Sequence, residues 1–216
     1  MEPFIRTDQF QFIKLQTQIL INGHSSVNDR NVLTALKSLA SDKVSNLFSD
    51  INAEQKQLVE PIIEVVDSEK AEKYLGKLKP YVIPFKQVTE QTVKKLFPKA
   101  KKLRLPSLDG IDLKELTYLG WNDKGTNKKF IITPYKNDII GLHGTFTPAS
   151  KKGFCTLCNR HAEVGLFMSE TKGIAQGTFV RRGNYICIDS QKCNENLISL
   201  EKLEDFIAVL KGKSNL

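Results

Sequence analysis

Four cysteines, the only ones in this 216-residue chain, form two pairs in its last third. Two residues separate Cys155 from Cys158, and five separate Cys187 from Cys193. A pair that flanks a two-residue turn directs both sulfurs toward one point, and a second pair can complete a tetrahedral four-thiolate zinc site. Because four thiolates leave no open coordination position for water, the pattern predicts one structural Zn²⁺.

Two other uses of these residues remain open. His161 could replace one cysteine as a metal ligand, or the first pair could be a redox pair of the thioredoxin type. The redox interpretation leaves the second pair without a role and requires a strand, the CxxC turn and a helix in a βαβ unit. If the metal interpretation is correct, we expect Lys192 and Arg160 to offset the excess negative charge of the thiolates.

The elements around the cysteines are predicted to be a knuckle, a hairpin and a helix. Residues 164–168 and 177–186 have the composition of strands, and a turn lies between them. Asp189 or Ser190 can cap a helical turn that places Cys193 near its start. This order is that of a treble-clef zinc finger. The segment is too short to bury a large apolar core, so metal bonds are expected to replace one.

Arginine and aromatic side chains surround the predicted metal site. Arg181, Arg182 and Tyr185 are predicted to lie in a turn, Phe154 precedes the first cysteine, and Phe206 belongs to a final amphipathic helix. This composition is typical of protein interface hot spots and also of RNA-stacking surfaces. Packing in the core is the alternative for Phe206.

The first 80 residues predict a small bundle of amphipathic helices with short joints. Asn28, Asn52 and Ser68 are the predicted N-caps, and Asn52 opens a variant of the capping box. Pro61 is expected to kink or divide the third helix, because proline lacks the amide that a helix interior needs.

The pattern of residues 81–150 is mainly that of a sheet, in contrast to the helical pattern of the first 80 residues. Strand-like runs at 116–121, 129–133 and 139–146 alternate with polar turns, which predicts an antiparallel meander. Alternating basic and apolar residues at 102–105 predict a further strand with a basic face.

The whole pattern predicts an α+β protein with two domains. An N-terminal helical bundle is expected over residues 1–82, followed by a C-terminal antiparallel-sheet domain over 83–216. The second domain is expected to end in the treble-clef zinc finger, over about 152–216.

The net charge of +8 is unevenly distributed along the chain. Residues 1–80 carry a net −1, residues 81–150 a net +6, and residues 151–216 a net +3. Such a field favours an acidic partner, either nucleic acid or protein. The sequence has no apolar run long enough to span a membrane and does not begin like a signal peptide, so we expect a cytoplasmic protein.

Three blocks around the cysteines resemble the elongation factor G-binding proteins of Gram-positive bacteria, which include the fusidic acid resistance proteins of the FusB type. These blocks are KGFCTLCN (152–159), GLFM (165–168) and GNYICIDSQKCN (183–194). Residues 101–106, 118–122 and 127–131 are also similar to that family, whereas the first 80 residues match it mainly as a helical bundle.

The resemblance implies a protein that is not an enzyme. It implies binding to elongation factor G, on and off the ribosome, and release of the factor from the ribosome when fusidic acid has locked it there with GDP. It implies that Phe154, Arg182, Tyr185 and Phe206 contact this partner. Resistance proteins of the family have Lys where this chain has Arg182, which keeps the charge but changes the hydrogen-bonding geometry. We expect a monomer that meets the ribosome only indirectly and does not meet a membrane.

Two other functions compete with this one. A basic treble clef with aromatic side chains could bind rRNA or tRNA and act on translation in that way. A metal-dependent hydrolase is the enzymatic alternative, but the sequence offers no ligand set with an open position.

Overall fold

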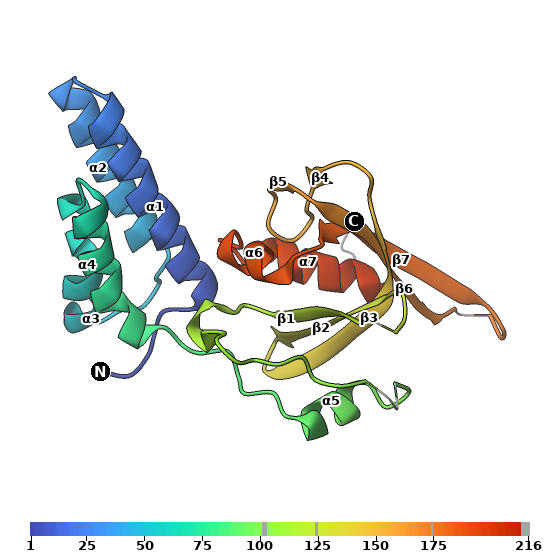
Figure 1. Cartoon of the computed structure of the whole chain (residues 1–216). Helices are drawn as coiled ribbons and strands as arrows, with labels where there is room; N and C mark the ends of the chain where they lie inside the picture. Colours follow the sequence, from blue (N-terminus) through green and yellow to red (C-terminus); the bar gives the residue numbers. More distant parts are fainter. Residues whose placement is uncertain (101–102, 124, 174, 213–216) are drawn as a thin grey trace. The chain divides into compact units, whose positions relative to one another are not determined.

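Figure 1 shows the computed structural model of the chain, which divides into two compact units, Met1–Ile83 and Pro84–Leu216. The structure describes residues 1–100, 103–123, 125–173 and 175–212. Within these ranges, no helix combines the length and the apolar character that crossing a membrane requires.

The N-terminal unit is a helical bundle in which α1 packs against α2 and α4. Its core contains Ile13, Leu20, Val44, Ile62 and Leu78, which are all buried. The helices are α1 (Thr7–Ser26), α2 (Arg30–Ser45), α3 (Ala53–Val59) and α4 (Ser68–Leu78), with the short 3₁₀ helices η1 (Glu60–Glu64) and η2 (Lys79–Tyr81).

Local sequence chemistry sets the start and end of α3. The Asn52 side chain accepts a hydrogen bond from the Gln55 amide at 2.9 Å, and the Gln55 side chain accepts one from the Asn52 amide at 2.9 Å. The predicted capping box is therefore confirmed. Pro61 lies in η1, so the helix is divided near the proline, as its missing amide predicts.

The caps of α2 and α4 each lie one residue from the predicted position. Asp29, not Asn28, accepts the first amides of α2, and Asp67, not Ser68, caps α4. A carboxylate is a strong acceptor for the free amides at a helix start, and it also interacts favourably with the helix dipole.

The C-terminal unit is built on an antiparallel five-stranded sheet with the order β1-β2-β3-β6-β7. Its strands are β1 (Leu119–Asp123), β2 (Lys128–Tyr135), β3 (Asp138–Pro148), β6 (Val164–Lys172) and β7 (Phe179–Cys187). A separate pair is formed by β4 (Gly153–Phe154) and β5 (His161–Ala162). The described helices of this unit are α5 (Glu90–Leu96), η3 (Leu113–Glu115), α6 (Ser190–Glu195) and α7 (Glu201–Leu210).

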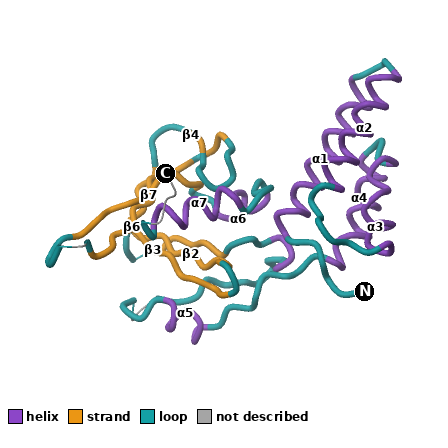
Figure 2. Tube along the Cα trace, turned by 180° about the vertical axis from the view of Figure 1, so that it is seen from behind, coloured by secondary structure: helices purple, strands orange, loops and turns teal. Residues whose placement is uncertain are grey.

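Each face of the sheet is covered by apolar packing. In Figure 1, α6 and α7 lie on one side of β1–β3 and α5 lies on the other, and Figure 2 shows the same arrangement from behind. Ile131, Phe146 and Phe167 belong to the core beneath α7, whereas Phe130 and Ile132 belong to the core near α5. Neighbouring residues of β2 therefore face opposite cores, which explains why this strand is apolar along most of its length.

The prediction of a strand at 102–105 is wrong over residues 103–105, which the structure describes. Lys102 lies outside the described residues, and 103–108 form an irregular segment. Leu103 and Leu105 pack partly against the core near α5, while Arg104 is exposed. The alternation of apolar and basic residues thus reflects burial of one side of a loop. Pro106 disfavours a strand here, because it has no amide hydrogen to donate to a neighbouring strand.

Candidate metal centre and partner-binding face

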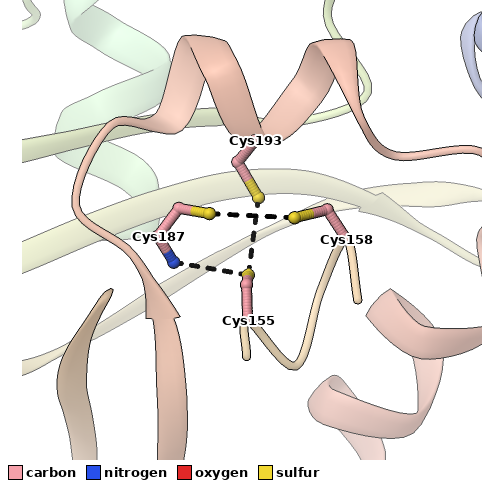
Figure 3. A group of neighbouring side chains, drawn as sticks. All are labelled: Cys155, Cys158, Cys187 and Cys193. Carbon is pink, nitrogen blue, oxygen red and sulfur yellow. Dashed lines mark hydrogen bonds between the residues drawn. The ribbon is translucent and has the colours of Figure 1, made fainter. Parts of the chain in front are cut away.

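The four cysteine sulfurs come together in one buried cluster, within 4.8 Å of one another. Cys155 Sγ lies 3.7 Å from Cys193 Sγ, and Cys158 Sγ lies 3.7 Å from Cys187 Sγ (Figure 3). A zinc–sulfur bond of about 2.3 Å gives tetrahedral sulfur–sulfur separations of about 3.8 Å. These separations are far longer than a disulfide bond, and they fit a four-thiolate zinc ion.

The elements deliver the cysteines in the order that the sequence predicts. Cys155 and Cys158 lie in the knuckle between β4 and β5, and Cys187 ends β7. Cys193 lies in α6, whose first amides bond to the side chain of Asp189, one of the two predicted caps. The Cys187 amide donates to the Cys155 sulfur at 3.3 Å, so the backbone also stabilises negative charge on sulfur.

The two alternative uses of the cysteines do not fit this geometry. His161 lies in β5 with its ring edge-on to Phe154, and the cluster of possible ligands among the described residues contains only cysteines. The CxxC turn lies between two short strands, not between a strand and a helix of a βαβ unit.

A buried lysine lies beside the metal centre. Lys129 of β2 is 0% exposed, and its Nζ donates to the carbonyl oxygen of Ile188 at 2.9 Å. The same Nζ lies 4.8 Å from the centroid of the Phe146 ring. Burial lowers the pKa of Lys129 to about 8, while the negative charge of Cys193 and Cys187 raises it. Zinc with four thiolates carries a net charge of about −2, which this ammonium group partly offsets.

The sequence alone does not indicate a role for this lysine at the metal. Lys192 and Arg160, which the sequence favoured for the same role, are both exposed to solvent. An exposed cation is screened by water, so the buried Lys129 has the stronger interaction with the thiolates.

Asn194 ties the metal centre to the sheet. Its Oδ1 accepts hydrogen bonds from the amides of Thr117 and Tyr118 at 2.7 and 3.0 Å. Its Nδ2 donates to the carbonyl oxygens of Tyr118 and Ser190 at 2.9 and 2.8 Å. All the hydrogen bonds that a buried amide side chain can make are therefore used, and α6 is fixed to the chain that enters β1.

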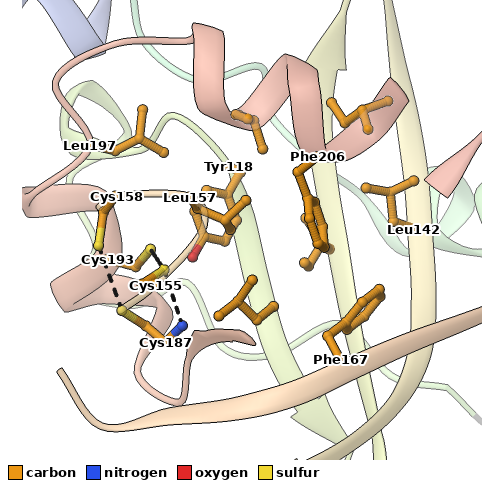
Figure 4. Packing of buried hydrophobic residues seen from close by; sticks show 14 of the residues in the cluster. Tyr118, Leu142, Cys155, Leu157, Cys158, Phe167, Cys187, Cys193, Leu197 and Phe206 are labelled. Carbon is orange, nitrogen blue, oxygen red and sulfur yellow. Dashed lines mark hydrogen bonds between the residues drawn. The ribbon is translucent and has the colours of Figure 1, made fainter. Parts of the chain in front are cut away.

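The phenol of Tyr118 also belongs to this environment (Figure 4). Burial raises the pKa of Tyr118 well above its usual range, and Cys193 raises it further. Among the described residues, Cys193 and Ser190 lie near the hydroxyl, but neither makes a hydrogen bond of ordinary geometry with it. Tyr118 therefore keeps its proton and remains a potential donor toward thiolate sulfur.

Two exposed aromatic rings lie next to the metal knuckle. Phe154 is 69% exposed and Tyr185 is 44% exposed. The amide of Thr156, two residues after Phe154, donates to the carbonyl oxygen of Tyr185 at 2.9 Å. The metal knuckle and β7 thus present these rings from neighbouring backbone segments.

Residues 181–185 belong to β7 and pair with β6 along their whole length. The strand predicted over 177–186 is therefore confirmed, and the turn predicted within it is wrong. Strand alternation places Arg181 and Tyr185 on one face and Arg182 on the other. The Arg182 guanidinium lies next to Gly212, just beyond the end of α7, where a cation interacts favourably with a helix C-terminus. The Gly183–Asn184 pair is a local turn signal, but pairing with β6 overrides it.

Phe206 lies apart from the exposed rings. It is 2% exposed, and its ring centroid is 5.7 Å from that of Phe167 in the core under α7 (Figure 4). Leu203, Ile207 and Leu210 of the same helix are also buried, so the apolar side of α7 packs on the sheet. The surface position expected for Phe206 is not found, since that side of α7 is inside the unit.

Comparison with known proteins gives matches over both units. A family model described as "Elongation factor G-binding protein, N-terminal" matches residues 4–86, and one described as "FBP C-terminal treble-clef zinc-finger" matches residues 93–207. The "Structure of the fusidic acid resistance protein FusC" aligns with a TM-score of 0.82 and 32% identity, covering 96% of this chain and 97% of that chain. No curated protein matches the chain. The zinc-finger match and the cysteine cluster identify the cofactor as one structural zinc.

Proposed function

Because this chain belongs to the family of elongation factor G-binding proteins of the FusB type, we propose that it binds elongation factor G through its C-terminal unit. The observation that carries the proposal is the pair of exposed rings, Phe154 and Tyr185, held beside the zinc knuckle. Aromatic side chains on a rigid support bury a large area at little cost in conformational entropy.

Zinc contributes to this binding by fixing the backbone. The knuckle that follows Phe154 and the strand that carries Tyr185 both contain zinc ligands, Cys155 and Cys187. The metal therefore holds both rings in place before the partner arrives. Arg181 completes the same region with a guanidinium group, which is common in interface hot spots.

Arg182 and Phe206, which the family resemblance implies as contacts, have different surroundings here. Arg182 is half-buried next to Gly212, at the end of α7, on the side of β7 opposite Tyr185. In our proposal it meets the partner from the edge of the sheet. Phe206 acts indirectly, by packing α7 against the strands that carry the exposed rings.

We further propose that binding promotes release of elongation factor G from the ribosome, including complexes that fusidic acid has stalled with GDP. A binding protein can shift such an equilibrium only if its affinity differs between the two states of the partner. The chain must therefore bind free elongation factor G, or a departing form of it, more tightly than the locked form. No catalytic group is needed for this action, and the drug is left unmodified.

Ribosome pelleting tests the release step. Ribosomes loaded with elongation factor G, GDP and fusidic acid are sedimented with increasing concentrations of the zinc-loaded chain. We expect the factor to move from the pellet to the supernatant as the chain is added, and Tyr185→Ala to need a higher concentration for the same effect. Retention of the factor in the pellet at a saturating concentration of the chain would contradict the release proposal.

A further inference from the structure

A third exposed aromatic ring lies on β7, at a position that the sequence did not single out. Phe179 begins the strand and is 63% exposed. Its partner in β6 is Lys172, and the pairing continues without interruption to Val164 and Cys187. Because alternate residues of a strand share one face, Phe179 lies on the same face as Arg181 and Tyr185.

These residues form a continuous stripe, defined here as Phe179, Arg181, Tyr185 and the neighbouring Phe154. The Arg181 Nε donates to the Glu170 carboxylate of β6 at 2.8 Å, which holds the guanidinium against the sheet. Gly183 lies against the backbone of β6, where a Cβ would overlap the carbonyl oxygen of Phe167, so no side chain stands between Arg181 and Tyr185. The stripe thus has aromatic rings at both ends and a tethered cation between them.

The backbone along the stripe is also open to a partner. β7 is the last strand of the five-stranded sheet, so among the described strands none pairs with its outer edge. The Tyr185 carbonyl and the Cys187 amide both bond away from β6, to Thr156 and to the Cys155 sulfur. By the same alternation, the peptide groups of Phe179 and Arg181 also point outward.

An open edge with exposed aromatic rings is unusual for a protein surface. Natural sheets protect their edge strands with charges, prolines or covering segments, because an open edge invites pairing with other chains. At the zinc end the knuckle covers the edge of β7, whereas Phe179 lies at the far end of the strand. The uncovered part of the strand therefore has the features of a docking edge.

We propose that Phe179 is a contact residue for elongation factor G, and that the binding surface extends from the zinc knuckle along β7. This inference rests on the proposed function, because the stripe is continuous with Phe154 and Tyr185. A partner segment that lies along β7 would bury the Phe179 ring and approach the outward peptide groups.

Calorimetric titration of elongation factor G with the full zinc-loaded chain tests the proposal. Phe179→Ala should raise the dissociation constant by at least fivefold, and Phe179→Leu should recover part of the loss. Val209→Ala serves as the control, since Val209 is an exposed apolar residue on α7. Because Phe179 is exposed, the melting temperature and zinc content of the variants should equal those of the wild type.

The outcomes separate the two proposals. If the wild-type chain binds and Phe179→Ala binds equally well, the extension along β7 is wrong, and the zinc-knuckle surface remains. If the wild-type chain does not bind at all, the proposed function fails together with this inference. Light scattering adds a third outcome, because a wild-type dimer that Phe179→Ala dissociates would assign the edge to a second copy and overturn the proposal.

Discussion

The ammonium group of Lys129 donates a 2.9 Å hydrogen bond to the carbonyl oxygen of Ile188, the residue that follows the zinc ligand Cys187. These two residues lie 59 positions apart in the sequence, one in the middle of the sheet and one at the end of the hairpin. The contact places a buried positive charge beside an anionic metal centre. It also makes the zinc finger part of the sheet domain, not an independent module.

Lys129→Met should weaken zinc retention. Methionine preserves much of the side-chain volume but removes the charge and the donor, so the thiolate centre loses its buried counter-charge. Changes to groups that surround metal ligands typically cost about 10- to 100-fold in metal affinity. We expect a loss in that range in a competition titration with a chromogenic zinc chelator.

The neighbouring Lys128→Met is the matched control, because Lys128 is exposed on the same strand. It should retain zinc as the wild type does. Equal zinc affinity in Lys129→Met and Lys128→Met would show that Lys129 has no electrostatic role at the metal.

Asn194→Ala should destabilise the C-terminal unit strongly. The change removes four hydrogen bonds and leaves the buried amides of Thr117 and Tyr118 without an acceptor. Each unsatisfied buried group costs about 1–3 kcal/mol, so we expect a loss of about 2–4 kcal/mol in the free energy of unfolding. Urea denaturation followed by circular dichroism measures this loss.

Asn196→Ala, in the same region of the chain, is the control for Asn194. The half-buried Asn196 side chain donates to the carbonyl oxygen of Lys192 at 2.7 Å, in a hydrogen bond that is exposed to solvent. Its loss should cost less than about 1 kcal/mol. Similar values for the two variants would mean that the Asn194 network contributes little beyond an ordinary surface contact.

The direct effect of Phe206→Ala should be a loss of stability, and any loss of binding should follow from it. The ring is buried against Phe167, and truncation of a buried phenylalanine typically costs about 3–5 kcal/mol. Thermal unfolding should therefore show a clearly lower melting temperature. An unchanged melting temperature together with weaker binding of elongation factor G would instead mean that Phe206 contacts the partner directly.

His143 should make stability depend on pH below its ordinary pKa of 6.5. One side of the largely exposed imidazole packs near the rings of Phe97 and Phe130, and this partial loss of solvent lowers the pKa of His143 in the folded protein. The charges of Lys128 and Lys99 lower it further. Between the lowered pKa and 6.5, the unfolded chain binds more protons than the folded one, so the free energy of unfolding falls as the pH falls.

His143→Gln should remove that component of the pH dependence, which denaturation at several pH values from 5 to 7.5 can measure. NMR titration of His143 gives a second test, in which Lys128→Gln should raise the pKa of the imidazole. A folded-state pKa at or above 6.5 in the wild type would contradict the assignment.

The metal centre was predictable from sequence because its signal is local. The CxxC spacing and the aspartate cap at 189 specify a knuckle and a helix start without reference to the rest of the fold. The strands of the meander were predictable for a similar reason, since alternation within a few residues reflects burial of one face.

The surface around the metal was less predictable, because it depends on contacts between distant segments. The Gly183–Asn184 pair is typical of a turn, and only its pairing with β6 in the folded structure makes it part of a strand. The sequence is compatible with a core or a surface position for Phe206, and the packing of α7 on the sheet decides that it is buried. Lys129 reads as an outward-facing strand residue, and only the approach of Ile188 and the thiolates explains a buried charge there.

Calorimetric titration of elongation factor G with the zinc-loaded chain and its Tyr185→Ala variant tests the central claim most directly. We expect saturable binding by the wild type and a dissociation constant about 30-fold higher for Tyr185→Ala, which corresponds to the roughly 2 kcal/mol of a hot-spot residue. Both proteins should have equal zinc content and melting temperature. Absence of binding by the wild-type protein, or equal affinity of the two proteins, would contradict binding through the face beside the zinc knuckle.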